Sequence, residues 1–120
     1  MPRQYTLAQA SERLAALRPL LDEVVALRAD AAELQASFQG GPPTDLGGLP
    51  ELKAAEARLD ELVALITADD VELKGIAPLL LDLPGEVDGE PALLCWLEGE
   101  VDIRWWHRPH LGFLGRRPLG

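Results

Sequence analysis

The chain has 120 residues, a formal net charge of −9 and 48% hydrophobic residues. This length suits a modest core and leaves no room for separate cofactor and substrate domains, so we expect a single domain over residues 1–120. The hydrophobic content argues against a disordered chain, and the lack of any run of about 18 apolar residues argues against a membrane helix. With one cysteine, Cys95, and no signal-like N-terminal segment, the sequence predicts a cytoplasmic protein.

Charge is divided unevenly along the chain. Residues 1–100 carry 19 acids and 7 bases, whereas residues 101–120 carry one acid and four bases. Phosphate binding needs clustered cations, and the basic tail supplies only a short patch of them. The acidic body therefore argues against nucleic acid as a partner. The tail either pairs with acidic groups of the protein itself or takes part in binding a ligand.

Residues 6–39 are predicted to form one long helix. Thr6 and Gln9 have the spacing of a capping box, which places the first helical turn directly after Thr6. Pro19 lies inside the helix and lacks an amide donor, so we expect a kink or a break near residues 15–19. Apolar residues recur at intervals of three and four, as in a coiled-coil seam: Leu7, Ala10, Leu14, Leu17, Leu21, Val24, Leu27, Ala31, Leu34 and Phe38.

A second helix is predicted over residues 50–70, after a loop at residues 40–49 that is rich in glycine and proline. The loop lacks the Gly-Lys-Ser/Thr ending of a phosphate-binding loop, so it is interpreted as a linker. A short connection between two amphipathic helices predicts an antiparallel hairpin. The second helix is the shorter one, so part of the first apolar stripe remains uncovered, and this predicts a homodimer formed through the helices. The second stripe consists of Leu52, Ala55, Leu59, Leu62 and Ile66.

A small antiparallel sheet of about three strands is predicted over residues 76–107. The expected strands are 79–83, closed by Pro84-Gly85, then 92–97 and 101–106. The fold class is therefore α+β: a long, coiled-coil-like antiparallel helical hairpin, the small sheet, and a basic C-terminal loop at residues 108–120. The expected register places Leu94, Trp96, Val101, Ile103 and Trp105 against the helices, and Leu93, Cys95, Leu97, Asp102, Arg104 and Trp106 on the opposite face.

Several short motifs, taken in order, resemble the bacterial domain of unknown function 2203 (DUF2203) family. The resemblance spans nearly the whole chain and implies the same architecture, but it brings no established reaction. The motifs are Tyr5-Thr6-Leu7 with Ala10, Leu81-Asp82-Leu83-Pro84, Leu94-Cys95-Trp96, Gly99-Glu100, Trp106-His107 and Gly112-Phe113-Leu114-Gly115-Arg116.

The candidate ligand-binding residues all lie in the C-terminal stretch. His107 ends a strand, so it is either a structural histidine at the rim of the core or a ligand or proton-transfer group. His107 and His110 are separated by a proline and do not form a helical metal pair; because only Cys95 lies nearby as a further ligand, no metal site is predicted. The candidates are Trp106, His107, Arg108, His110, Phe113, Arg116 and Arg117.

Two kinds of ligand suit this stretch. Haem needs one axial histidine, His107 or His110, together with an apolar wall, and arginines pair with its propionates. A loop bracketed by Gly112 and Gly115 presents backbone amides beside Arg116, which suits a small carboxylate or phosphate. The alternative for the loop is that its glycines only shape a turn.

The sequence shows little sign of catalysis, and no catalytic residue is assigned. It has no Gly-x-Ser-x-Gly elbow, and Cys95 in a strand next to Trp96 is typical of a small core residue. The leading hypothesis is therefore a soluble, non-enzymatic, dimeric interaction or ligand-binding protein. The alternative is haem or small-anion binding through the C-terminal stretch, and the third is a small enzyme that uses His107 as acid or base.

Overall fold

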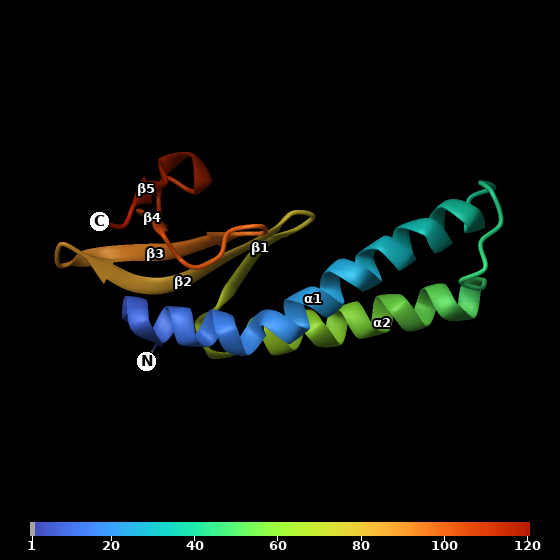
Figure 1. The fold of residues 1–120 in the computed structure, drawn as a ribbon, viewed down its shortest axis with the longest axis horizontal. Helices are drawn as coiled ribbons and strands as arrows, with labels where there is room; N and C mark the ends of the chain where they lie inside the picture. Colours follow the sequence, from blue (N-terminus) through green and yellow to red (C-terminus); the bar gives the residue numbers. More distant parts are fainter. Residues whose placement is uncertain (1) are drawn as a thin grey trace. The chain divides into compact units, whose positions relative to one another are not determined.

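The computed structural model describes residues 2–120, which divide into two compact units (Figure 1). The sheet unit comprises the chain up to residue 18 together with residues 67–120, and the hairpin unit comprises residues 19–66. Within the described residues, no helix combines the length and the apolar character needed to cross a membrane. The elements are α1 (Leu7–Phe38), α2 (Leu49–Ile66), β1 (Glu72–Ile76), β2 (Leu79–Val87), β3 (Glu90–Leu97), β4 (Trp105–His107) and β5 (Arg117–Pro118), with 3₁₀ turns η1 (Ala68–Asp70) and η2 (Phe113–Gly115).

Helix α1 begins where the capping box predicts. The amide of Thr6 donates to Oε1 of Gln9 at 3.0 Å, and the amide of Gln9 donates to Oγ1 of Thr6 at 3.1 Å. The helix continues through Pro19 to Phe38, so of the kink or break expected near residues 15–19, the break does not occur. Buried leucines lie two residues to either side of Pro19, at Leu17 and Leu21, and their packing outweighs the one lost helical hydrogen bond.

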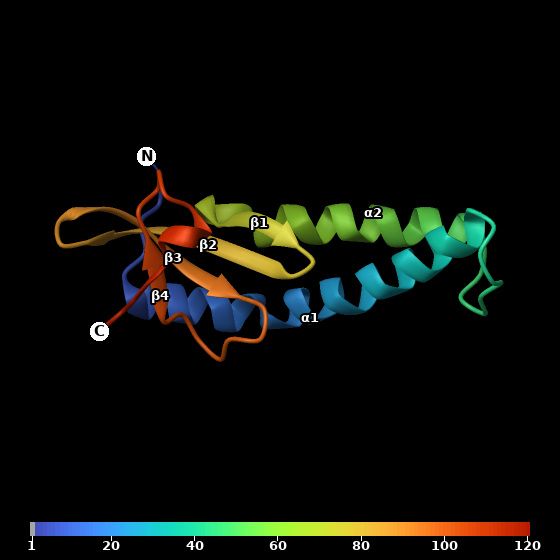
Figure 2. The ribbon, with the colours of Figure 1, turned by 90° about the horizontal axis from the view of Figure 1, so that it is seen from above.

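The hairpin unit pairs the later part of α1 with α2. The two helices run side by side and are joined by residues 39–48 (Figure 2). Arg58 on α2 forms a bidentate ion pair with Glu23 on α1, with Nε and Nη2 at 2.7 and 2.9 Å from the two carboxylate oxygens. Helix α2 ends at Ile66 rather than near residue 70, because Asp69 and Asp70 adopt positive φ angles of 56° and 64°.

The apolar stripe of α1 is largely covered within one chain. Only its two ends, Leu7 and Phe38, are strongly exposed, at 45% and 61%. The uncovered apolar surface of α1 is therefore smaller than the sequence predicts, and the dimer through the helices stays a prediction. The buried stripe residues are Ala10, Leu14, Leu17, Leu21, Val24 and Leu34.

The sheet has five antiparallel strands in the order β1-β2-β3-β4-β5, rather than about three. The sequence missed β1, whose side chains alternate between exposed and half-buried, and the two-residue β5. It also placed a strand at residues 101–106, of which only Trp105 and Trp106 are in β4. Residues 101–104, which precede β4, do not pair with a neighbouring strand. Instead, Nη2 of Arg18 donates to the carbonyls of Glu100 and Val101.

Strand β2 passes through Pro84-Gly85, although these residues were expected to end it. Strand β1 pairs with β2 only as far as Asp82, so Pro84 lies on an open edge where no amide donor is needed. The carbonyl of Pro84 accepts a hydrogen bond from the amide of Tyr5 at 2.7 Å on that edge. A side chain at Gly85 would meet the carbonyl oxygen of Tyr5 at 2.8 Å, so glycine permits this close approach.

The strand register corrects the expected assignment of faces. Cys95 pairs with Trp105 and Leu94 pairs with Trp106, so Trp106 shares the face of Leu94, and Trp105 shares the face of Cys95. We call the face that bears Leu94 and Trp96 the helix face, because Arg18 of α1 lies 5.0 Å from the ring centre of Trp96 on that face. Figure 1 shows the first turns of α1 running along the sheet. The other face of the sheet is the distal face. His107, two residues from Trp105, also lies on the distal face.

Candidate functional site

A buried polar cluster lies on the distal face of the sheet and consists of Asp82, Cys95 and His107. The residues come from the adjacent strands β2, β3 and β4, and Asp82 pairs directly with Cys95. Their carboxylate, thiol and imidazole ligand atoms all lie within 4.8 Å of one another. Each residue is at most 3% exposed. The pairing of the strands thus brings together three ionisable side chains that are separated by up to 25 positions in the sequence.

The imidazole of His107 is held between two acceptors. Nε2 lies 3.1 Å from both carboxylate oxygens of Asp82, and Nδ1 lies 2.8 Å from the carbonyl oxygen of Arg108. A neutral imidazole has only one N–H and satisfies only one acceptor, whereas an imidazolium satisfies both. When Nδ1–H donates to the carbonyl of Arg108, Nε2 and the carboxylate of Asp82 are both acceptors. A proton or a metal ion is therefore needed between these two groups.

Cys95 is a protonated thiol at neutral pH in this environment. Burial, reinforced by the neighbouring carboxylate of Asp82, raises the pKa of the Cys95 thiol to about 12. A nucleophilic cysteine needs the opposite shift, toward the thiolate. The arrangement therefore does not activate Cys95 as a nucleophile.

Arg116 closes the cluster on the side of the C-terminal segment. Its Nη2 donates to a carboxylate oxygen of Glu100 at 2.6 Å and to the carbonyl oxygen of Cys95 at 3.4 Å. The guanidinium lies 5.0 Å from the ring centre of Trp105 and 4.9 Å from that of Phe113. Burial alone would lower the pKa of Arg116, but the hydrogen bonds and charge interactions with Glu100 and Cys95 together outweigh burial, and the net shift is upward. Its charge is thus neutralised within the protein.

The other predicted site residues occupy separate places. Arg108 donates to the carbonyls of three residues around the β2–β3 turn, at 3.0 to 3.1 Å, and stacks on Trp106 at 4.5 Å. His110 is exposed in the turn after β4, and Arg117 is exposed on β5. The predicted set is therefore not one site. Phe113 and Arg116 come together over Trp105, whereas His107 lies inside the sheet unit.

Asp82 is the member of the cluster that was not singled out from the sequence. A signal was present, since Asp82 is the only charged residue among the leucines of residues 79–83. An ionisable group in a buried strand needs a partner, and this requirement points to a histidine or a basic residue elsewhere. The place of Cys95 in a strand next to Trp96 predicts a small core residue, and Cys95 is indeed buried, but the sequence does not show that Asp82 lies across the strand from it.

Haem and anion binding stay predictions. Both ring nitrogens of His107 have partners within hydrogen-bond distance, and the His107 side chain is 3% exposed. His110 is the exposed histidine of the two. The loop amides of Gly115 and Arg116 donate to the carbonyls of Gly112 and Phe113, which is the turn-forming role considered for these glycines.

An apolar groove lies next to the cluster on the sheet unit. It is lined by Gly75, Ala77, Pro78, Leu80, Leu97 and Phe113 and has a volume of about 380 Å³. None of these side chains ionises. The adjoining residue in η2, Leu114, is 99% exposed. The groove and this exposed apolar side chain are thus adjacent along the chain, through Phe113.

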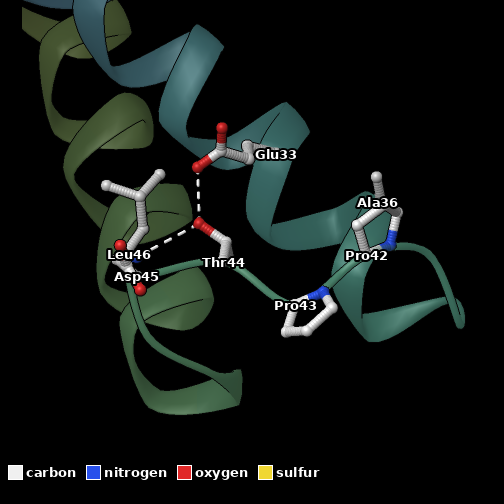
Figure 3. Close-up of a pocket in the computed structure, with 7 residues that line it drawn as sticks. All are labelled: Glu33, Ala36, Pro42, Pro43, Thr44, Asp45 and Leu46. Atoms are coloured by element: carbon white, nitrogen blue, oxygen red, sulfur yellow. Dashed lines mark hydrogen bonds between the residues drawn. The ribbon is translucent and has the colours of Figure 1, made fainter.

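A second hollow, of about 460 Å³, lies at the loop of the hairpin unit (Figure 3). Oγ1 of Thr44 donates to the carboxylate of Glu33 and accepts from the amide of Leu46 at 3.1 Å. These bonds order the loop between the helices, and both polar side chains are used within it. The hollow therefore reflects how the linker folds, in keeping with its prediction as a connection.

Comparison with known proteins gives one match. Residues 3–119 match the family model described as "Uncharacterized conserved protein (DUF2203)". No curated protein and no solved structure is significantly similar to the chain. The match covers nearly the whole sequence and confirms the resemblance seen in its motifs. The chain belongs to the DUF2203 family of uncharacterized conserved proteins.

Proposed function

We propose that this chain is a non-enzymatic interaction protein that forms a homodimer through an apolar patch of the sheet unit. The patch consists of Pro78, Leu80, Leu97, Phe113 and Leu114. The observation that carries the proposal is the full exposure of Leu114 beside a groove of uncharged side chains. A leucine exposed to this extent has almost no contact with the rest of its own chain.

The patch has the self-complementary form that a twofold dimer requires. In such a dimer a protrusion on one subunit enters a hollow on the other, and the reverse contact follows by symmetry. Leu114 provides the protrusion and the neighbouring groove provides the hollow. An uncharged hollow accepts a leucine without burying an unpaired charge.

Charge favours this patch over the helices as the contact surface. The hairpin unit carries nine acidic and three basic residues, so its net charge is −6. Two such units brought together repel each other, whereas the groove has no ionisable lining. A non-enzymatic role is further supported by the protonated thiol of Cys95 and the burial of His107.

Leu114→Glu is expected to weaken self-association at least about 100-fold, because it places a charge in an apolar contact. Light scattering over a range of concentrations measures the change in the dissociation constant. Val101→Glu is the matched control, since Val101 is 81% exposed in the same unit but does not line the groove. This control is expected to associate like the wild type.

Two outcomes would contradict the proposal. A wild-type protein that remains a 13.0 kDa monomer at micromolar concentrations would exclude a stable homodimer. A dimer that persists equally in Leu114→Glu and Val101→Glu would place the interface elsewhere, with the helices as the surface that the sequence predicts.

A further inference from the structure

We propose that Asp82, Cys95 and His107 form a binding site for one divalent transition-metal ion of the zinc class. This inference concerns the buried cluster and is independent of the proposed dimer. The cluster offers a carboxylate oxygen, a sulfur and an imidazole nitrogen, which is a ligand set that zinc and cobalt accept. Calcium and magnesium prefer oxygen ligands alone and are not expected to bind here.

The distances suit a single ion. Tetrahedral bonds of about 2.0 to 2.3 Å hold ligand atoms roughly 3.3 to 3.6 Å apart. Nε2 of His107 already lies 3.1 Å from the oxygens of Asp82, and all three ligand atoms lie within 4.8 Å of one another. The sulfur of Cys95 therefore has to move by no more than about 1.5 Å to reach the ligand separation of a tetrahedral site.

The surroundings of His107 orient it as metal ligands are usually oriented. Its Nδ1 faces the carbonyl oxygen of Arg108 at 2.8 Å, so an Nδ1–H donates there and leaves the lone pair of Nε2 directed at Asp82. A carbonyl partner of this kind fixes the tautomer and the ring of a ligating histidine. The metal ion would replace the proton that otherwise has to lie between Nε2 and the carboxylate.

Charge also balances when the ion is bound. The thiol of Cys95 loses its proton to solvent and becomes a thiolate, and any second proton on the His107–Asp82 pair is released as well. One thiolate and one carboxylate then neutralise a divalent cation. Arg116, the basic group nearest to Cys95, is already paired with Glu100 at 2.6 Å, so its charge is compensated.

Cobalt titration tests the site through a signal that only a sulfur ligand produces. Protein freed of metal with a chelator and kept reduced is titrated with Co²⁺, and absorbance is recorded in the near ultraviolet. One ion per chain is expected, with a thiolate-to-cobalt charge-transfer band that disappears when Zn²⁺ displaces the cobalt. A folded wild-type protein that shows no such band would overturn the proposal.

Variants assign the ligands. Cys95→Ser is expected to abolish the band, and Asp82→Asn and His107→Gln are expected to weaken binding by about 100-fold or more, beyond the 10- to 100-fold effect of losing an outer-shell partner. His110→Gln is the control, because His110 is exposed and outside the cluster. Equal affinity in His107→Gln and His110→Gln would contradict the assignment.

A measurement on the unmodified chain covers the case in which these variants fail to fold. Cys95 is the only cysteine, so its alkylation rate reports on this site alone. In moderate urea, where the site opens transiently, Zn²⁺ is expected to slow alkylation at least about 10-fold by stabilising the closed form. An unchanged rate at saturating Zn²⁺ would overturn the proposal, whatever the oligomeric state.

Discussion

Asp82→Ala is expected to lower the free energy of unfolding of the sheet unit by roughly 3 to 5 kcal/mol. The substitution leaves His107 buried, with Nε2 facing no acceptor, and a buried group that loses its partner keeps the full cost of its desolvation. Trp96, Trp105 and Trp106 all lie in the sheet unit. Their fluorescence during urea denaturation therefore follows the unfolding of this unit.

Glu86→Ala is the matched control for Asp82→Ala. Glu86 lies four residues along the same strand and the same face, but it is exposed, so its loss is expected to change stability by about 0.5 kcal/mol or less. His107→Ala should also destabilise, and the double variant should lose less than the two single losses combined. Strictly additive losses would show that Asp82 and His107 do not interact.

Leu62→Ala is expected to cost about 2 to 5 kcal/mol of stability in the hairpin unit. Leu62 is 0% exposed on α2, and its truncation removes buried methyl groups and leaves a cavity between packed helices. Urea denaturation followed by circular dichroism of the helices measures the loss. The magnitude depends on how far neighbouring leucines close the cavity.

Leu65→Ala provides the comparison for Leu62→Ala. Leu65 lies three residues further along α2 and is 50% exposed, so the same truncation there is expected to cost about 0.5 kcal/mol or less. Similar losses in the two variants would mean that the helix face toward the core is assigned wrongly.

The helices were predictable from the sequence because their signals are local. The capping pair Thr6 and Gln9 and the three-four spacing of leucines act within a few residues, and they place the start of α1 at Leu7. A local rule predicts a kink or a break near Pro19; the break does not occur, because packing of the flanking leucines outweighs the lost hydrogen bond. A local rule gives the energetic cost of a proline inside a helix. It does not include the stabilisation that the flanking leucines gain by packing in the folded chain.

The sheet and the cluster were less predictable because they depend on pairing between distant strands. A shift in the expected position of one strand moved Trp105 and Trp106 to the wrong faces and placed His107 at a boundary. The withdrawal of residues 101–104 from the ladder depends on Arg18, more than 80 residues earlier. His107 was nevertheless recognised as a candidate, although its partner Asp82 was not.

The buried position of His107 underlies the stability effect of Asp82→Ala, the metal site and the separation of the apolar patch from the cluster. Imidazole proton exchange in ¹⁵N-labelled, metal-free protein tests it most directly, since His107 and His110 are the only histidines. A slowly exchanging ring N–H is expected for the buried His107, and rapid exchange is expected for the exposed His110. Equally rapid exchange at both histidines would contradict the buried position of His107.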